Sequence, residues 1–138
     1  MKYLVDSDYV ADFLKGRPTA TDLLNTLFQD GMAMSIITFA EVYEGIYYGY
    51  NRTHYTRIFQ RFLHGVSVLG ITRSIAKQYA FMRGELGRKG QLIDQPDLFI
   101  AATATYHHLM LVTQRQRLSA YSRPQHLPSK LVPNPDTD

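Results

Sequence analysis

The chain has 138 residues, a formal net charge of +3 and no cysteine. This length fits one folded domain with its own core and is too short for two full-sized domains. The lack of cysteine excludes a disulfide framework and thiolate catalysis, and it fits a reducing compartment. No stretch approaches the roughly 20 apolar residues of a membrane span, and the N-terminus lacks the apolar core of a secretion signal. We therefore expect a single domain over residues 1–133, a frayed tail over 134–138, and a soluble, cytoplasmic protein.

Charge is distributed unevenly along the chain. Residues 1–50 hold seven acids against three bases, whereas residues 51–90 hold eight bases against one acid, Glu85. A basic segment beside an acidic one would suit a polyanionic substrate that approaches a metal held by carboxylates. On charge alone, a solvated helical surface is the simpler interpretation.

Short apolar runs rich in β-branched residues alternate with longer segments of helical period, which is typical of a parallel sheet covered by helices. In chain order we expect a strand at 2–6, helices at 7–15 and 18–30, a strand at 32–37, helices at 38–50 and 52–64, a strand at 66–71, helices at 72–88 and 95–108, a strand at 109–113, a short helix at 115–122 and a fifth strand at 130–133. The pattern predicts an α/β fold with a mainly parallel sheet of about five strands.

Several acids end a predicted strand or begin a predicted helix. Asp6 ends the first strand, and Glu41 falls in the first turn of the helix expected at 38–50. Asp94 and Asp97 open the helix that precedes the fourth strand. Because ligands of open α/β sheets bind beyond the carboxyl ends of the strands, we expect these acids to converge on one edge of the sheet.

Helix capping is an alternative role for each of these acids taken alone. Thr38 and Glu41 fit a capping box. Asp94 and Asp97 fit a helix start, and Asp6 could cap the helix that follows it. A cap does not require an acid at the end of a strand, however, so the joint placement of Asp6, Glu41 and Asp97 favours a site. Carboxylates of this kind bind hard divalent ions, and the chemistry would be phosphoryl hydrolysis with one or two ions.

The motifs that hold these acids resemble those of PIN domains. LVDSDYV resembles the family's L-x-D-T-x-x-L, TFAEVYEG resembles T-x-x-E-x-x-x-G, and DLFIAATA, followed by LVT, resembles D-x-x-I-A-A-x-A. The match extends over nearly the whole chain in the right order. The small size and the form of the second motif most resemble VapC-type toxins of type II toxin-antitoxin pairs.

The resemblance implies a three-layer α/β/α sandwich and a Mg²⁺-dependent endoribonuclease, with Mn²⁺ as the alternative ion. It assigns both catalysis and metal binding to Asp6, Glu41 and Asp97. It also implies an RNA substrate such as tRNA or rRNA, a cognate VapB-type antitoxin that occupies the active site, and a homodimer.

Five further residues are expected to support these ligands or to contact the substrate: Ser7, Asp8, Asp94, Thr113 and Arg115. Ser7 stands where the family often has Thr, and Asp8 where relatives often have Asn. Thr113 matches the Thr that closes the fourth strand. Arg115 is a departure, because many members have Asp or Asn there and an arginine cannot ligate a metal. Four interpretations stay open: the three core acids suffice, Asp94 or Asp8 supplies the missing oxygen, the guanidinium binds the scissile phosphate, or Arg115 is a plain surface arginine.

Two other functions fit parts of the sequence. VDSDYV matches D-x-D-x-[TV], the first motif of haloacid-dehalogenase-like phosphatases, with Asp6 as nucleophile and Asp8 as general acid. That interpretation leaves Glu41 without a task and finds no good match for the later motifs. The second alternative is a catalytically silent PIN-like domain that binds RNA or a partner while Arg115 fills the pocket.

A stripe of aromatic and aliphatic residues follows the predicted helix at 38–50. Its members are Tyr43, Ile46, Tyr47 and Tyr50, spaced i, i+3, i+4 and i+7. This spacing is typical of core packing, and the tyrosines would also suit contact with an antitoxin or a second subunit.

Overall fold

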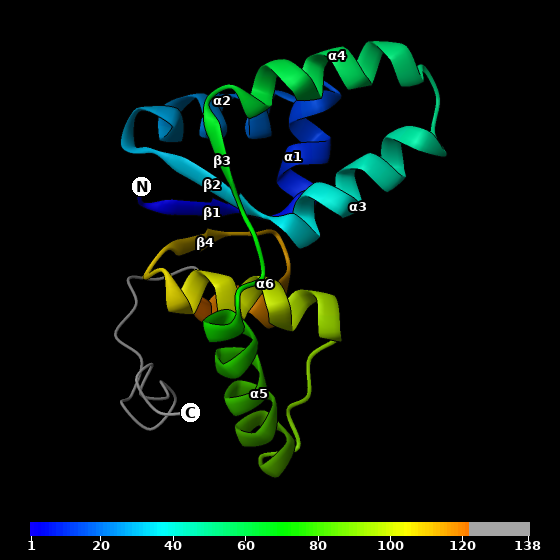
Figure 1. Cartoon of the computed structure of the whole chain (residues 1–138). Coiled ribbons are helices and arrows are strands. Elements are labelled where there is room, and N and C mark those ends of the chain that lie inside the picture. Colours follow the sequence, from blue (N-terminus) through cyan, green and yellow to red (C-terminus); the bar gives the residue numbers. More distant parts are fainter. Residues whose placement is uncertain (122–138) are drawn as a thin grey trace.

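The computed structural model describes residues 1–121. The strands are β1 (Tyr3–Val5), β2 (Met32–Ser35), β3 (Val66–Leu69) and β4 (Met110–Val112). The α-helices are α1 (Ser7–Leu14), α2 (Pro18–Leu27), α3 (Ile36–Tyr47), α4 (Arg52–Leu63), α5 (Arg73–Arg88) and α6 (Gln95–Tyr106), and two 3-10 helices are η1 (Phe28–Asp30) and η2 (Gln116–Tyr121). Figure 1 shows the helices arranged on both sides of a small sheet.

The sheet has the strand order β3-β2-β1-β4, and every neighbouring pair is parallel. In this register Tyr3 lies opposite Met32 on one side and Met110 on the other. The predicted parallel α/β fold is therefore confirmed, with four strands in residues 1–121. The fifth strand expected at 130–133 and the tail at 134–138 lie outside the described residues.

The strand side chains alternate between two hydrophobic cores, as the pleat of a strand requires. Leu4 and Ala33 belong to one core, which is built mainly with residues of α5, α6 and η2. Val5 and Met34 belong to the other, which is built with residues of α1 to α4. Figure 1 shows these two sets of helices on opposite faces of the sheet, so the chain forms the expected three layers.

Helix α3 begins two residues earlier than the sequence predicts. Ser35 is its N-cap, and the Ser35 hydroxyl accepts a hydrogen bond from the Ile37 backbone N–H at 3.1 Å. The β-branched residues after Ser35 suggested a longer strand, but this cap turns the chain into the helix. The Thr38 hydroxyl has no hydrogen-bond partner. The predicted capping box of Thr38 and Glu41 is therefore wrong, and Glu41 lies in the second turn of α3 rather than the first.

The remaining boundaries differ from the predicted ones by up to three residues. The segment predicted as one helix at 18–30 divides into α2 and η1, and the short helix predicted at 115–122 is the 3-10 helix η2. In the part of the chain described here, no helix combines the length and the apolar character needed to cross a bilayer.

Candidate active site

Two deeply buried acids meet where β1 and β4 end. Asp6 directly follows β1 and is 0% exposed, and Asp97 lies in the first turn of α6 and is 2% exposed. The Asp6 backbone N–H donates to the Val112 carbonyl at 2.9 Å, which ties the ends of the two strands together. One residue pairs with both acids, since Arg115 Nε lies 3.5 Å from Asp6 Oδ2 and Arg115 Nη1 pairs with Asp97 Oδ1.

Asp6 has hydrogen bonds on both carboxylate oxygens. Its Oδ1 accepts from the Ser7 backbone N–H at 2.7 Å, which makes Asp6 the N-cap of α1 as the capping interpretation allowed. Its Oδ2 accepts from the Thr113 hydroxyl at 2.7 Å. The Thr113 hydroxyl in turn accepts from the Arg115 backbone N–H at 3.0 Å. A charged acid can stay buried in this way because donors replace the water it has lost.

Glu41 reaches the same group of acids from the second turn of α3. Burial raises the pKa of the Glu41 carboxyl, while the Arg115 charge and a hydrogen bond from Ser7 oppose that rise. The charges of Asp6 and Asp97 raise the pKa further. Its Oε1 atom is buried and has no hydrogen-bond partner. Glu41 is therefore part of the cluster electrostatically, but its Oε1 atom lacks a partner, whereas both oxygens of Asp6 accept hydrogen bonds.

The two aspartates predicted to support the site occupy different positions. Asp8 is half-buried with its Oδ2 atom 3.8 Å from Arg115 Nε, and burial together with the Asp6 charge raises its pKa. Asp8 Oδ1 is buried and has no partner. Asp94 is exposed and pairs with Arg117 Nη1 at 3.6 Å. Asp8 thus belongs to the cluster, and Asp94 stands at its rim.

Arg115 lies at the centre of the cluster. Besides its ion pairs, its Nη2 atom donates to the Ser7 hydroxyl at 3.2 Å. Burial works to lower the pKa of the guanidinium, but the surrounding carboxylates outweigh this effect and raise it, led by Asp6 and Asp97. The guanidinium therefore remains a full positive charge among four acids.

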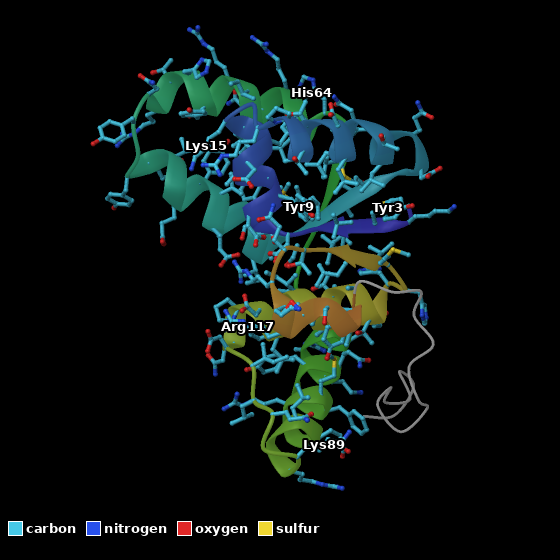
Figure 2. All side chains as sticks on the ribbon, turned by 180° about the vertical axis from the view of Figure 1, so that it is seen from behind. Tyr3, Tyr9, Lys15, His64, Lys89 and Arg117 are labelled. Carbon is cyan, nitrogen blue, oxygen red and sulfur yellow. The ribbon has the colours of Figure 1, made fainter. Side chains whose placement is uncertain are left out.

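Arg117 is a site residue that the sequence did not single out. It is labelled in Figure 2 and lies on η2, which packs on α6. Its Nη2 atom stands 2.8 Å from Asp97 Oδ2, although that oxygen receives no hydrogen bond of acceptable direction. The only feature of the sequence that pointed to Arg117 was its spacing. Arg115 and Arg117 are two residues apart and follow Thr113, which closes β4.

The donor set of the cluster fits a hard divalent cation. Such ions take carboxylate oxygens, and three buried ones, Asp8 Oδ1, Glu41 Oε1 and Asp97 Oδ2, have no hydrogen-bond partner. As they stand, residues 1–121 contain no group of three acidic or imidazole side chains that could hold one ion. The Arg115 guanidinium lies between the carboxylates that would do so.

Comparisons with known proteins give this arrangement a family context. Residues 3–124 match the family model of the PIN domain. Ribonuclease VapC2 of Haemophilus influenzae is 30% identical over 123 residues, which cover 85% of this chain and 89% of that protein.

Two solved structures are also similar. One is VapBC2 from Rickettsia felis bound to a promoter DNA fragment, with a TM-score of 0.79 and 23% identity over 88% of this chain and 93% of that one. At this identity the likeness supports the fold alone. The other is a toxin-antitoxin complex from Klebsiella pneumoniae, with a TM-score of 0.66 and 26% identity over 83% of this chain and 87% of that one.

Proposed function

Because this chain belongs to the PIN domain family, we propose that it is a VapC-type endoribonuclease that hydrolyses RNA phosphodiester bonds with the help of Mg²⁺ or Mn²⁺. The observation that carries the proposal is the meeting of two buried acids, Asp6 and Asp97, with the partly buried Glu41 at the carboxyl edge of a parallel sheet. The similarity to the Haemophilus ribonuclease supports the choice of RNA as substrate.

Asp6, Glu41 and Asp97 would hold the ion. When bound, the ion would supply a Lewis acid that activates water and neutralises charge on the phosphate oxygens. The chain's own groups orient these ligands: the Ser7 N–H and the Thr113 hydroxyl fix both oxygens of Asp6. Glu41 Oε1 has no protein partner, so it can accept a hydrogen bond from the attacking water. Asp8 adds negative charge beside Asp6 and so favours the approach of a cation.

The proposal also includes partners. We assign the chain a VapB-type antitoxin, because the similar Klebsiella structure is a toxin-antitoxin complex. A homodimer and a cytoplasmic location belong to the same proposal. The basic residues of 51–90 would guide the RNA through non-specific attraction to its phosphates.

One observation favours the silent RNA- or partner-binding domain as a second candidate. The Arg115 guanidinium lies among the carboxylates that would hold the ion, and a cation fixed there would leave the chain able to bind without cutting. The phosphatase alternative has no such support, since residues 3–124 match the PIN domain. The phosphatase motif also leaves Glu41 without a task.

The test is cleavage of total RNA and structured RNAs by the purified chain, with Mg²⁺, with Mn²⁺ or with EDTA, followed by mapping of new ends. We expect discrete cuts that require the metal and that Asp97→Asn reduces by about 100-fold or more, the scale on which a transition-state contact acts. Asp22→Asn makes the same chemical change at an exposed position on α2 and should cut like wild type. Equal cutting by a folded Asp97→Asn would refute the assignment, and absence of cuts across the panel would favour the silent domain.

A further inference from the structure

The position of Arg115 has a consequence for the proposed metal. A divalent ion and a guanidinium are both cations that carboxylates attract, and both would have to reach Asp6 and Asp97. Arg115 already pairs with these two acids and lies 3.8 Å from Asp8. We propose that Arg115 is a built-in competitor of the divalent ion, so that metal binding requires the guanidinium to leave the space between Asp6 and Asp97. This inference rests on the proposed function, because it concerns the same site.

The backbone that carries Arg115 is fastened to the site. The Arg115 N–H donates to the Thr113 hydroxyl, which donates to Asp6, so the loop after β4 is anchored on β1. The Arg115 carbonyl accepts from the Leu118 N–H at 3.0 Å, and Leu118 is fully buried. The backbone is thus held at both ends, and any exchange with a metal must come from rotation of the side chain alone.

The Arg115 side chain is less enclosed than its partners. It is 26% exposed, whereas the Asp6 and Asp97 side chains are almost fully buried. A long arginine side chain can adopt several staggered rotamers, so the guanidinium can leave the acids by rotation, at the cost of its ion pairs. The buried acids and the partly exposed arginine together describe an anionic site with a removable cation.

The charge of the cluster explains why such a cation is needed. Asp6, Asp8, Glu41 and Asp97 would repel one another without a positive group between them, and burial makes the repulsion stronger than in water. Arg117 neutralises part of this charge, but only from the side of Asp97 and Asp94. In the absence of a divalent ion, Arg115 is the group that contacts Asp6, Asp8 and Asp97 at once.

Calorimetric titration with Mn²⁺ tests the competition without using RNA. Arg115→Gln should bind Mn²⁺ more tightly than wild type by about tenfold or more, the scale of coupling between two mutually exclusive ligands. Arg88→Gln is the matched control, because Arg88 is exposed and pairs with Glu85 on α5, away from the site. Its affinity should equal that of wild type. Equal or weaker binding by Arg115→Gln would overturn the inference while leaving the ribonuclease proposal intact.

A second measurement uses the wild-type chain, in case Arg115→Gln does not fold without metal. Mg²⁺ titration followed by NMR of the arginine Nε–H groups should move the Arg115 signal in step with metal binding and leave the Arg88 signal in place. An Arg115 signal that stays constant while Mg²⁺ saturates the protein would overturn the competition. Absence of metal binding by both wild type and Arg115→Gln would remove the metal itself, and with it both this inference and the metal-dependent ribonuclease.

Discussion

Glu41 and Asp6 illustrate two ways of keeping an acid inside a protein. Asp6 accepts strong hydrogen bonds on both oxygens. Glu41 has a buried oxygen without a partner and a raised pKa, for which burial is the largest cause. An acid held in this way costs stability when it is charged, and proteins accept such a cost at sites that must bind a ligand.

Replacement of Glu41 by Gln should therefore stabilise the apo protein at neutral pH. The folded-state pKa of Glu41 lies above its ordinary value of 4.5, so folding favours the protonated form. The stability that this preference contributes is present below pH 4.5 and is lost as pH rises through the folded-state pKa. At about pH 7, the free energy of unfolding of Glu41→Gln should exceed that of wild type by less than about 1 kcal/mol after solvent screening. The difference should vanish near pH 4.

Urea unfolding in EDTA at several pH values checks this prediction. Glu44→Gln, which makes the same change at an exposed acid one turn further along α3, is the matched control. A Glu41→Gln protein less stable than wild type at neutral pH would contradict the account, because it would mean that the attraction to Arg115 outweighs the cost of burial.

The sequence predicted which acids would meet, whereas Arg115 in the pocket was only one of several open interpretations. Asp6 and Asp97 could be predicted because each is fixed by the end of a strand or the start of a helix. Arg115 and Arg117 follow β4 at the start of the short helix predicted at 115–122, which is too short for periodicity to indicate the direction of a side chain. The contacts of Arg117 with Asp94 and Asp97 could not be predicted from the sequence, because they depend on the packing of η2 against α6.

At the scale of elements, the start of α3 determines where Glu41 points. The Ser35 hydroxyl caps this helix, whereas the Thr38 hydroxyl is buried without a partner. Ser35→Ala should lower the free energy of unfolding by about 0.5–2 kcal/mol, since it leaves the Ile37 N–H without its acceptor. Thr38→Val should be neutral or stabilising, because it replaces an unpaired buried hydroxyl by a methyl group. Equilibrium unfolding of the two variants compares them, and a larger loss for Thr38→Val would restore the capping-box interpretation.

The aromatic and aliphatic stripe predicted on α3 includes both buried and exposed residues. Ile46 is buried, whereas Tyr50, just beyond the helix, is 91% exposed and lines a pocket of about 310 Å³ with Leu14, Val42 and Ile46. An apolar pocket bordered by an exposed tyrosine is suited to an apolar side chain of the proposed antitoxin. Periodicity predicted that these residues share one face of the helix. It does not predict how far the hydrophobic core extends along that face.

Tyr50→Ala should weaken antitoxin binding by about tenfold or more while leaving the melting temperature unchanged. Tyr106→Ala, at the end of α6, removes another exposed tyrosine from a different face and is the control. The measurement is the affinity of wild type and of both variants for the cognate antitoxin. Equal affinities for wild type and Tyr50→Ala would exclude this pocket as the docking site.

At the scale of the whole molecule, the site joins the two layers of helices. Glu41 comes from α3, whose buried residues pack in one core, and Asp97 comes from α6, which packs in the other. Asp6 stands between them at the end of the sheet. The alternation of short apolar runs with helical segments predicted a sheet covered by helices, and the resemblance to PIN domains implied the three layers. The separation of the carboxylates could not be predicted, since it depends on how the two layers and the Arg115 loop pack together.

The proposed function requires Asp6, Glu41 and Asp97 to hold a divalent ion. Anomalous scattering from crystals grown in saturating Mn²⁺ locates such an ion. We expect a manganese peak coordinated by these three carboxylates, with the Arg115 guanidinium moved away from Asp6 and Asp97. A map with no manganese at the three acids, and with Arg115 still paired to Asp6 and Asp97, would contradict it.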